Sequence, residues 1–172
     1  MKNFSGATLF LDRDDINTDE IIPAKYLTEN SKIDLGPFVL EDLKLDGFSP
    51  ETDVEKAQVI VTRNNFGCGS SREHAVWVFE VNDINVVIGE GFARIFRQNM
   101  FNCGMLAIEL SAPEIDLIYG LGDDVHVAVE LEQETLQATG NGKSLDFSFT
   151  LNSFDKDLVR AGGWLAYADK KY

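Results

Sequence analysis

Short apolar runs alternate with polar, glycine-containing segments along the first two-thirds of the chain. The runs expected to form strands lie at residues 5–11, 59–61, 86–88 and 105–110. Helix-like runs occur between them, at residues 75–81 and 92–102. Strand runs separated by helices are typical of an α/β architecture. We therefore expect a sheet covered by helices in this part of the chain.

The last third of the chain has a different pattern. A helix with Pro113 in its first turn is expected over residues 113–121. Apolar and polar residues then alternate over 125–131 and 145–149, with a turn at 140–142 between strand runs, which predicts a small attached β unit. A further helix over 155–161 ends at Gly162-Gly163, and a short final segment begins at Trp164.

Two segments of the first third are polar. Residues 12–19 contain four aspartates, but they lack the glycine and the spacing of a calcium loop, so we expect a structured turn that places Asp19-Glu20 at a helix start. Residues 28–55 form a long connection with a brief helical pattern at 39–45. Long loops are commonly functional, so this one is either a lid or specificity loop or an exposed insertion.

Composition limits the possible functions. A chain of 172 residues suits one domain over residues 1–172, and its net charge of −14 argues against nucleic-acid binding. Without a leader or a membrane-spanning apolar run, we expect a cytoplasmic protein. Two cysteines, Cys68 and Cys103, are too few to hold an iron–sulfur cluster. Four of six arginines nevertheless lie within one span, at positions 63, 72, 94 and 97, so a local anion site is possible.

The segment NNFGCGSSREHA at residues 64–75 combines several chemical signals. Gly67 and Gly69 permit backbone angles that other residues avoid. Ser70 or Ser71 is placed to cap the following helix, with Glu73 in a capping-box position. A helix N-terminus beside Arg72 would attract a carboxylate or a phosphate. The alternative is that the serines are only helix caps.

Three blocks in chain order resemble the swivelling domain of the aconitase superfamily, closest to the small subunits of its dehydratases. The first is DINTDEIIPAKYL at residues 15–27, the second is the segment 64–75, and the third is GFARIFRQN at residues 91–99. This resemblance implies a three-layer β/β/α fold. It also implies a hydro-lyase that removes and re-adds water on a hydroxylated di- or tricarboxylic acid.

The resemblance assigns roles to individual residues. Ser70 would be the base that takes a proton next to a carboxylate, stabilised by the amides around Gly69 to Arg72. Ser71 would bind or position the substrate, and Arg72 would clamp a carboxylate. The resemblance places a [4Fe–4S] cluster in the superfamily's active site. Because this chain cannot hold one, the cluster would come from a larger partner subunit.

The substrate expectation depends on Tyr26-Leu27-Thr28 at the start of the long connection. In the resembled family this position separates alkyl-bearing acids from acids with an extra carboxylate, which an arginine would suit. Thr28 and Glu29 offer no positive charge. We therefore expect an alkyl-substituted malate, with isopropylmalate ahead of dimethylmalate or citraconate, and homoaconitate last.

The same residues allow other interpretations. A catalytically inert anion-binding or interaction module would keep the glycine turn but would not need a deprotonable serine. A thiol nucleophile at Cys68 with His74 as its base lacks a third orienting group. His126 alternates with strand valines, so we expect it to be exposed or structural. We expect a structural role for Arg97 and leave the role of Arg94 open.

Overall fold

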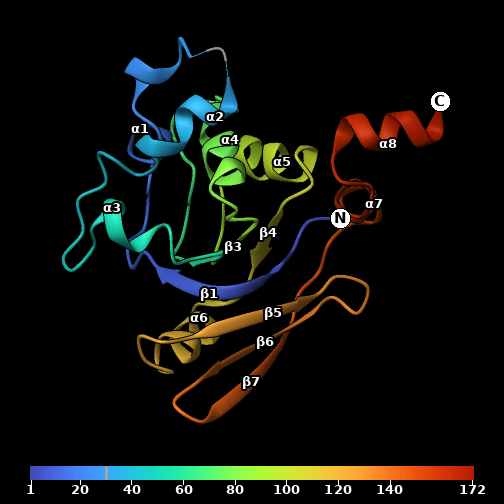
Figure 1. The fold of residues 1–172 in the computed structure, drawn as a ribbon. Coiled ribbons are helices and arrows are strands. Elements are labelled where there is room, and N and C mark those ends of the chain that lie inside the picture. Colours follow the sequence, from blue (N-terminus) through green and yellow to red (C-terminus); the bar gives the residue numbers. More distant parts are fainter. Residues whose placement is uncertain (30) are drawn as a thin grey trace.

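A mixed sheet organises the computed structural model, which describes residues 1–29 and 31–172 (Figure 1). Its strands, in order across the sheet, are β4 (Leu106–Glu109), β3 (Val86–Gly89), β2 (Val59–Val61), β1 (Ser5–Phe10), β5 (His126–Glu130), β6 (Thr135–Gly140) and β7 (Lys143–Ser148). The first four are parallel to one another, and β5 to β7 continue the sheet antiparallel from β1. The expected strand runs are thus confirmed, and β6 is an addition to them.

Helices fill the connections between the parallel strands. The α-helices are α1 (Thr18–Ile21), α2 (Lys32–Leu35), α3 (Pro50–Asp53), α4 (His74–Val81), α5 (Arg94–Asn102), α6 (Ala112–Tyr119), α7 (Ser153–Ala161) and α8 (Trp164–Lys171), and two 3₁₀ turns are η1 (Ala24–Tyr26) and η2 (Gly36–Phe38). Helices α4 and α5 connect neighbouring parallel strands, which is the arrangement expected of an α/β fold.

The sheet curls at β1 into two β layers. The helices α1, α2, α4 and α5 gather on one side of β1, whereas β5, β6 and β7 lie on the other side together with α6 (Figure 1). Strands β2 and β3 are buried along their whole length, but β5 buries only every second residue, Val127 and Val129. Full burial is typical of parallel strands covered on both faces, and alternation is typical of a strand with one face in water.

The turn expected at 140–142 joins β6 to β7 directly. Asn141 and Gly142 both have positive φ, 51° and 71°. This is the geometry of a two-residue type I′ turn, which matches the twist of a hairpin and favours Asn-Gly. The local sequence therefore set the register of this hairpin, in which Gly140 pairs with Lys143.

The long connection differs from its prediction. The helical pattern expected at 39–45 is a series of turns, and the short helix α2 and the 3₁₀ turn η2 come before it. Leu40 has a positive φ of 56°, which a continuing helix does not allow, and its N–H donates to the carbonyl of Ile21 at 2.8 Å. The apolar residues Val39, Leu40 and Leu43 were spaced for burial against the core, not for a helix.

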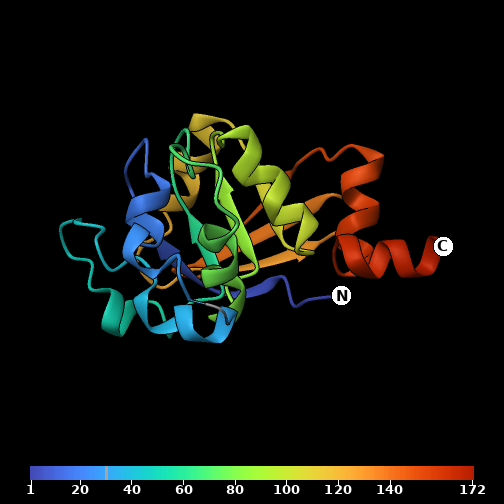
Figure 2. The same cartoon turned by 90° about the horizontal axis from the view of Figure 1, so that it is seen from above.

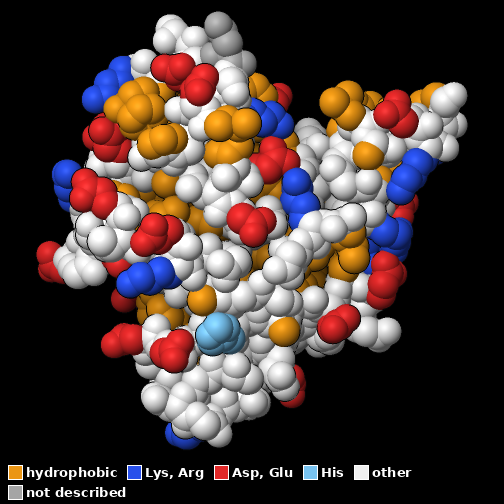
Figure 3. Space-filling view, in the orientation of Figure 1, with side chains coloured by type: hydrophobic (Ala, Val, Ile, Leu, Met, Phe, Trp, Pro, Cys, Tyr) orange, Lys and Arg blue, Asp and Glu red, His pale blue; other side chains and the backbone are white. Residues whose placement is uncertain are grey.

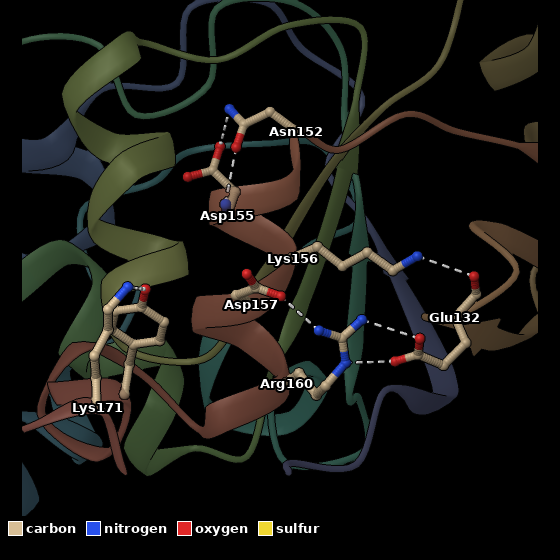
Figure 4. Close-up of polar contacts among 8 residues, drawn as sticks. Glu132, Asn152, Asp155, Lys156, Asp157, Arg160 and Lys171 are labelled. Atoms are coloured by element: carbon tan, nitrogen blue, oxygen red, sulfur yellow. Dashed lines mark hydrogen bonds and ion pairs between the residues drawn. The ribbon is translucent and has the colours of Figure 1, made fainter. Parts of the chain in front are cut away.

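The C-terminal helices lie at one end of the molecule, whereas α1 lies at the other (Figures 1 and 2). The Asn152 side chain caps α7 by accepting from the N–H of Asp155 at 2.8 Å, and Gly162 ends the helix with a φ of 97°. Arg160 binds both carboxylate oxygens of Glu132, at 2.7 and 3.0 Å (Figure 4). This two-point pair joins α7 to the turn after β5.

The surface reflects the acidic composition. On the face drawn in Figure 3, acidic side chains are spread over most of the outline, with basic side chains between them. Within the described part of the chain, no helix is long and apolar enough to cross a membrane.

Candidate active site

The three sequence blocks meet at one edge of the parallel sheet. β1, β2 and β3 are parallel, so the loops that follow them emerge on the same side. A bridge joins Asn17 to Cys68, and another joins Phe66 to Phe92. The edge at the carboxyl ends of parallel strands is where α/β proteins commonly bind ligands. The candidate site is therefore built from segments 12–19, 64–73 and 90–93.

Two aspartates, Asp14 directly before the first block and Asp15 at its start, act as structural links. Asp14 Oδ1 accepts a hydrogen bond from the backbone N–H of Asn64 at 2.9 Å, and Asp15 Oδ1 accepts one from the Asn65 amide at 2.9 Å. The N–H of Asp15 donates in turn to the carbonyl of Asn64 at 3.0 Å. These bonds tie the first block to the second and agree with the structured turn expected at 12–19.

Helix α1 begins where the sequence predicts, with Asp19 and Glu20 in its first turn. Asn17 is the N-cap and forms a capping box with Glu20. Arg13 also pairs with Glu20. Burial alone would raise the pKa of Glu20, but the hydrogen bonds from Arg13 and Asn17 bring that pKa below its usual value. A charged Glu20 therefore fixes the start of α1, which carries Thr18.

The glycines of the second block are required by close contacts. Gly67 has a φ of 83°, and a Cβ there would lie 2.2 Å from Cγ of Phe96. Gly69 has a φ of 103°, and a Cβ there would lie 3.2 Å from the hydroxyl oxygen of Thr18. The ring of Phe66 contacts Phe96 edge to face beneath this loop, at 5.4 Å between centroids. The two glycines thus let the loop lie against α5 and α1.

Ser70 lies between Thr18 and Arg72. Arg72 Nε donates a hydrogen bond to Ser70 Oγ at 2.6 Å, and the hydroxyl oxygen of Thr18 lies 3.3 Å from Ser70 Oγ. The backbone N–H of Ser70 donates to Thr18 Oγ1 at 3.2 Å. A positive donor and a hydroxyl both favour negative charge on the serine oxygen.

Arg72 is held by more than the serine. Its Nη1 atom donates to Asp19 Oδ1 at 2.7 Å and contacts the carbonyl oxygen of Ile22 at 3.5 Å. The Arg72 side chain is 15% exposed, whereas that of Asp19 is 67% exposed. The guanidinium is therefore oriented before any substrate binds, with one carboxylate already on it.

The helix caps expected at Ser70 and Ser71 are wrong. Helix α4 begins at His74, its N-cap is Glu73 in a helical conformation, and no side chain caps it. The Thr18 hydroxyl oxygen accepts a hydrogen bond from the Ser70 N–H, and the Ser70 hydroxyl oxygen accepts one from Arg72. Ser70 therefore bonds to Thr18 and Arg72 and does not cap the helix. The expected capping box of Glu73 is also absent. Ser70 and Ser71 precede the helix instead of starting it.

The remaining expected site residues lie in two places. Gly69 and Ser71 are exposed beside Ser70. Tyr26 ends η1 and stacks on Phe38, with 3.9 Å between ring centroids and 6° between planes. Leu27 and the exposed Thr28 follow it. The structure brings Ser70 and Arg72 together, whereas the backbone hydrogen bonds of Tyr26 and Leu27 stay within their own turn.

Two functional candidates were missed by sequence analysis. Thr18 and Asp19 contact Ser70 and Arg72 directly, across 52 and 53 positions of the chain. Both residues lie inside the first block, between Asn17 and Glu20. Their position inside that block was the feature of the sequence that could have identified them. Their contact with the second block depends on the pairing of β1 with β2, which the sequence does not show.

Both cysteines lie in surroundings that favour the neutral thiol. Burial raises the pKa of Cys68 and raises that of Cys103 to about 11, so both are neutral thiols near pH 7. His74 packs against Trp77, with 4.7 Å between ring centroids. Among residues 1–29 and 31–172, no group of three or more His, Cys, Asp and Glu side chains is arranged to hold a metal ion. A [4Fe–4S] cluster takes about three or four thiolates, and the described residues supply two cysteines.

Arg97, His126 and Arg94 lie at half-buried or exposed positions. Arg97 donates to the carbonyl of Ala107 at 3.3 Å and pairs with Glu109, contacts that agree with the structural role expected for it. The side chain of His126 is 61% exposed, as expected. Arg94 is exposed at the first position of α5, inside the third block.

The fold and this site define an α/β domain of the aconitase type. The family model of the aconitase C-terminal domain matches residues 1–113, which contain all three blocks. A 3-isopropylmalate dehydratase small subunit of Deinococcus deserti is 39% identical over 155 residues, covering 90% of this chain and 81% of its own length. Another, of Aquifex aeolicus, is 37% identical over 161 residues, with 92% and 90% covered.

A solved structure agrees with these sequence matches. The crystal structure of a 3-isopropylmalate dehydratase from Methanocaldococcus jannaschii superposes with a TM-score of 0.79 at 30% identity, covering 97% of this chain and 93% of that one. The chain therefore belongs to the family of 3-isopropylmalate dehydratase small subunits, within the aconitase superfamily.

Proposed function

We propose that this chain acts as the small subunit of a 3-isopropylmalate dehydratase. Such a hydro-lyase interconverts 2-isopropylmalate and 3-isopropylmalate by dehydration and rehydration in leucine biosynthesis. The proposal rests on one observation above all, the 2.6 Å hydrogen bond from the Arg72 guanidinium to the Ser70 hydroxyl at the edge of the parallel sheet. The names of the relatives support the same activity.

Ser70 is the proposed base. The hydrogen to be removed sits on a carbon next to a carboxylate and is weakly acidic, so a strong base is required. An alkoxide is strong enough, but only if its charge is stabilised where it forms. Arg72 Nε supplies that stabilisation, and its planar guanidinium carries further donors for a substrate carboxylate. In the reverse direction, the proton returns from Ser70 Oγ to the substrate.

Arg72 and the exposed residues beside Ser70 form the proposed binding surface. A substrate carboxylate that reaches Arg72 replaces or shares the contact with Asp19, because Nη1 is already bonded to that side chain. Ser71 and the backbone at Gly69 are exposed on the same loop and are free to contact the acid. The pre-existing pair with Asp19 keeps the guanidinium aimed while the site is empty.

A second subunit completes the proposed site. Gly69, Ser70 and Ser71 are all exposed, so the isolated chain leaves its candidate base open to water. Water exclusion strengthens every electrostatic contact in an active site, which favours a partner covering this edge. We place the [4Fe–4S] cluster, the Lewis acid for the leaving hydroxyl in this superfamily, in that large subunit.

The proposal extends to the whole chain. We propose that residues 1–172 act as one domain, because the pairing of β1 with both β2 and β5 makes the parallel and antiparallel strands a continuous sheet. We also propose a cytoplasmic location, since both cysteines are free in the structure, as expected in a reducing compartment.

Reconstitution tests the proposed function. The chain is mixed with a large subunit, and hydration and dehydration of isopropylmalate are followed by ultraviolet absorbance of the unsaturated intermediate. The wild-type mixture is expected to turn over, while Ser70→Ala retains less than about 1% of kcat, because loss of a general base costs roughly 100-fold or more. Ser144→Ala, an exposed serine of β7, is the matched control and should be fully active.

Two outcomes would contradict the proposal. If the wild-type mixture shows no activity with any malate although the subunits associate, the chain is an inert module. If Ser70→Ala keeps activity within a few fold of wild type, the dehydratase assignment stands but Ser70 is not the base.

A further inference from the structure

Thr18 is a buried threonine whose hydroxyl faces the candidate base. It is 2% exposed and is the first residue of α1. Threonine within a helix often bonds a carbonyl three or four residues earlier, but the contacts of Thr18 Oγ1 described here are with Ser70 N and Ser70 Oγ. Its hydroxyl is thus directed to the neighbouring loop.

Thr62 shows what a purely structural threonine looks like in this protein. It is also fully buried, and its hydroxyl donates to the carbonyl of Leu11 at 2.9 Å. That bond satisfies the hydroxyl with a backbone group. The hydroxyl of Thr18 instead meets another hydroxyl, which gains or loses a proton in the proposed reaction.

The hydrogens around Ser70 Oγ can be assigned to their donors. Arg72 Nε–H donates to Ser70 Oγ at 2.6 Å, and Ser70 N–H donates to Thr18 Oγ1 at 3.2 Å. In the 3.3 Å contact between the two hydroxyls, either oxygen can be the donor while Ser70 is neutral. After Ser70 loses its proton, its oxygen can only accept, so the hydrogen in this contact must come from Thr18.

We propose that Thr18 is a positioning residue that anchors the Ser70 backbone and donates a hydrogen bond to Ser70 Oγ when that oxygen is deprotonated. This inference rests on the proposed role of Ser70 as the base. A hydrogen bond to a charged oxygen is stronger and shorter than one to a neutral hydroxyl, so the contact stabilises the reactive form more than the resting form. Only this difference in stabilisation between the two forms lowers the barrier and accelerates the reaction.

The surrounding structure holds Thr18 in place for this role. Its backbone N–H donates to the carbonyl of Cys68 at 2.8 Å, and the capping box of Asn17 and Glu20 fixes the start of its helix. Gly69 has no Cβ, so the loop can approach the Thr18 hydroxyl. The charged groups facing Ser70 are Arg72 and, across the guanidinium, Asp19.

The test uses the reconstituted enzyme and the pair Thr18→Val and Thr18→Ser. Valine keeps the shape and loses the hydroxyl, whereas serine keeps the hydroxyl. Thr18→Val is expected to lower kcat on the order of 10- to 100-fold, less than the loss of a short oxyanion-hole bond, with KM within a few fold of wild type. Thr18→Ser should keep kcat within a few fold.

The pH profile separates a positioning role from a structural one. Thr18→Val changes no charge, so the ascending limb of kcat against pH should move about one unit upward if the variant makes the alkoxide harder to form. Thr62→Val is the matched control. It removes an equally buried hydroxyl and should lower the melting temperature, while the kcat of the assembled enzyme and its pH profile stay unchanged.

Three outcomes decide the inference. If Thr18→Val has the kcat and pH profile of the wild type, or only the lowered melting temperature of Thr62→Val, Thr18 is structural and the inference is overturned. If Thr18→Val does not fold, Thr18→Ala is compared with Thr18→Ser, which differs from it by one hydroxyl, and equal kcat values overturn the inference. If Ser70→Ala keeps its activity, Ser70 is not the base. That outcome is distinct from a failure of the Thr18 inference, because it is measured on a different variant.

Discussion

At the scale of single residues, Arg72 divides its donors between two neighbours. Nε binds the Ser70 hydroxyl, and Nη1 binds Asp19. A planar guanidinium can make both contacts at once because its donors point in fixed, different directions, which an ammonium group cannot imitate. The sequence predicted a carboxylate clamp at this position, and the structure adds a direct contact with the candidate base.

Arg72→Lys is expected to reduce both substrate binding and turnover. A lysine ammonium can reach Ser70 or Asp19 but cannot bind both in the same geometry, so kcat/KM should fall on the order of 100-fold in the reconstituted enzyme. Steady-state kinetics with isopropylmalate give the separate effects on KM and kcat. A rise in KM alone would limit Arg72 to binding the substrate.

The control for this variant is Arg160→Lys. Arg160 also makes a two-point pair, with Glu132, but it lies in α7 at the opposite end of the molecule from α1 (Figures 1 and 4). Its kinetics should match the wild type. Unchanged KM and kcat in Arg72→Lys itself would remove Arg72 from the proposed site.

At the scale of elements, the start of the long connection is more ordered than its composition suggests. Tyr26 stacks on Phe38, and the N–H of Leu40 bonds to the carbonyl of Ile21, so the turn η1 is packed against the segment that follows α2. Thr28 is exposed just beyond that packed turn. A side chain at this position can therefore point toward a substrate without disturbing the core.

Thr28→Arg is expected to shift substrate preference toward acids with an additional carboxylate. The new guanidinium would offer a charge-assisted pair where the wild type has none, and the ratio of kcat/KM for homoaconitate over isopropylmalate should rise about tenfold. A competition assay with isopropylmalate, dimethylmalate and homoaconitate on the reconstituted enzyme measures it.

The matched control is Thr150→Arg, an exposed threonine beyond β7. It adds the same charge far along the chain from η1 and should leave the preference unchanged. If Thr28→Arg leaves the order of the three acids as in the wild type, or if the wild type itself prefers homoaconitate, the role of Thr28 is refuted.

At the scale of the whole molecule, two half-buried acids on different elements link stability to alkaline pH. Burial raises the pKa of Cys103, at the end of α5, from its ordinary value of 9.0 to about 11. Burial also raises the pKa of Tyr119, whose hydroxyl donates to the carbonyl of Val61 at 3.2 Å. Both groups stay protonated in the folded protein at pH values where the unfolded chain starts to lose these protons.

The free energy of unfolding should therefore be constant with respect to these groups below pH 9 and fall above it. Because the folded pKa of Cys103 lies above the unfolded value, the folded state holds the proton more tightly, and the loss runs from pH 9 to about 11. The full loss from Cys103 approaches about 3 kcal/mol, at about 1.4 kcal/mol per unit of pKa difference, and about 2 kcal/mol of it falls between pH 9 and about 11.

Urea unfolding at several pH values between 8 and about 11 checks this expectation. Cys103→Ala should start from a lower stability at pH 8 but lose about 2 kcal/mol less than the wild type over this range, since the ionising thiol is gone. Parallel curves for the two proteins would show that the thiol is not protonated preferentially in the folded state.

Much of the element order was predictable because it depends on local patterns. The short buried strands, the helices between them and the turn at Asn141-Gly142 follow from periodicity and from residues that accept positive φ. Strand β6 was harder to predict. Its sequence TLQATG contains Ala138 and Gly140, which have low strand preference, and pairing with both β5 and β7 stabilises the strand.

The candidate site was predictable in part. Ser70 and Arg72 could be named from their motif, and the structure places them in contact. The predicted start of helix α4 was wrong because a Ser-Ser-Arg-Glu sequence offers several possible caps. The structure instead depends on the Thr18 hydroxyl, which accepts the hydrogen bond from the Ser70 N–H. Local rules cannot account for a competing partner 52 positions away.

The sequence by itself determined the α/β order of elements, the glycines of the central loop and the family to which the chain belongs. The tertiary structure decided that Thr18 and Asp19 reach Ser70 and Arg72, and that the antiparallel strands curl beneath the parallel ones. The physical reason is that these features depend on the parallel register of β1 with β2, which places residues 12–19 beside residues 64–73. Periodicity along the chain reports which face of an element is buried, but not which neighbour covers it.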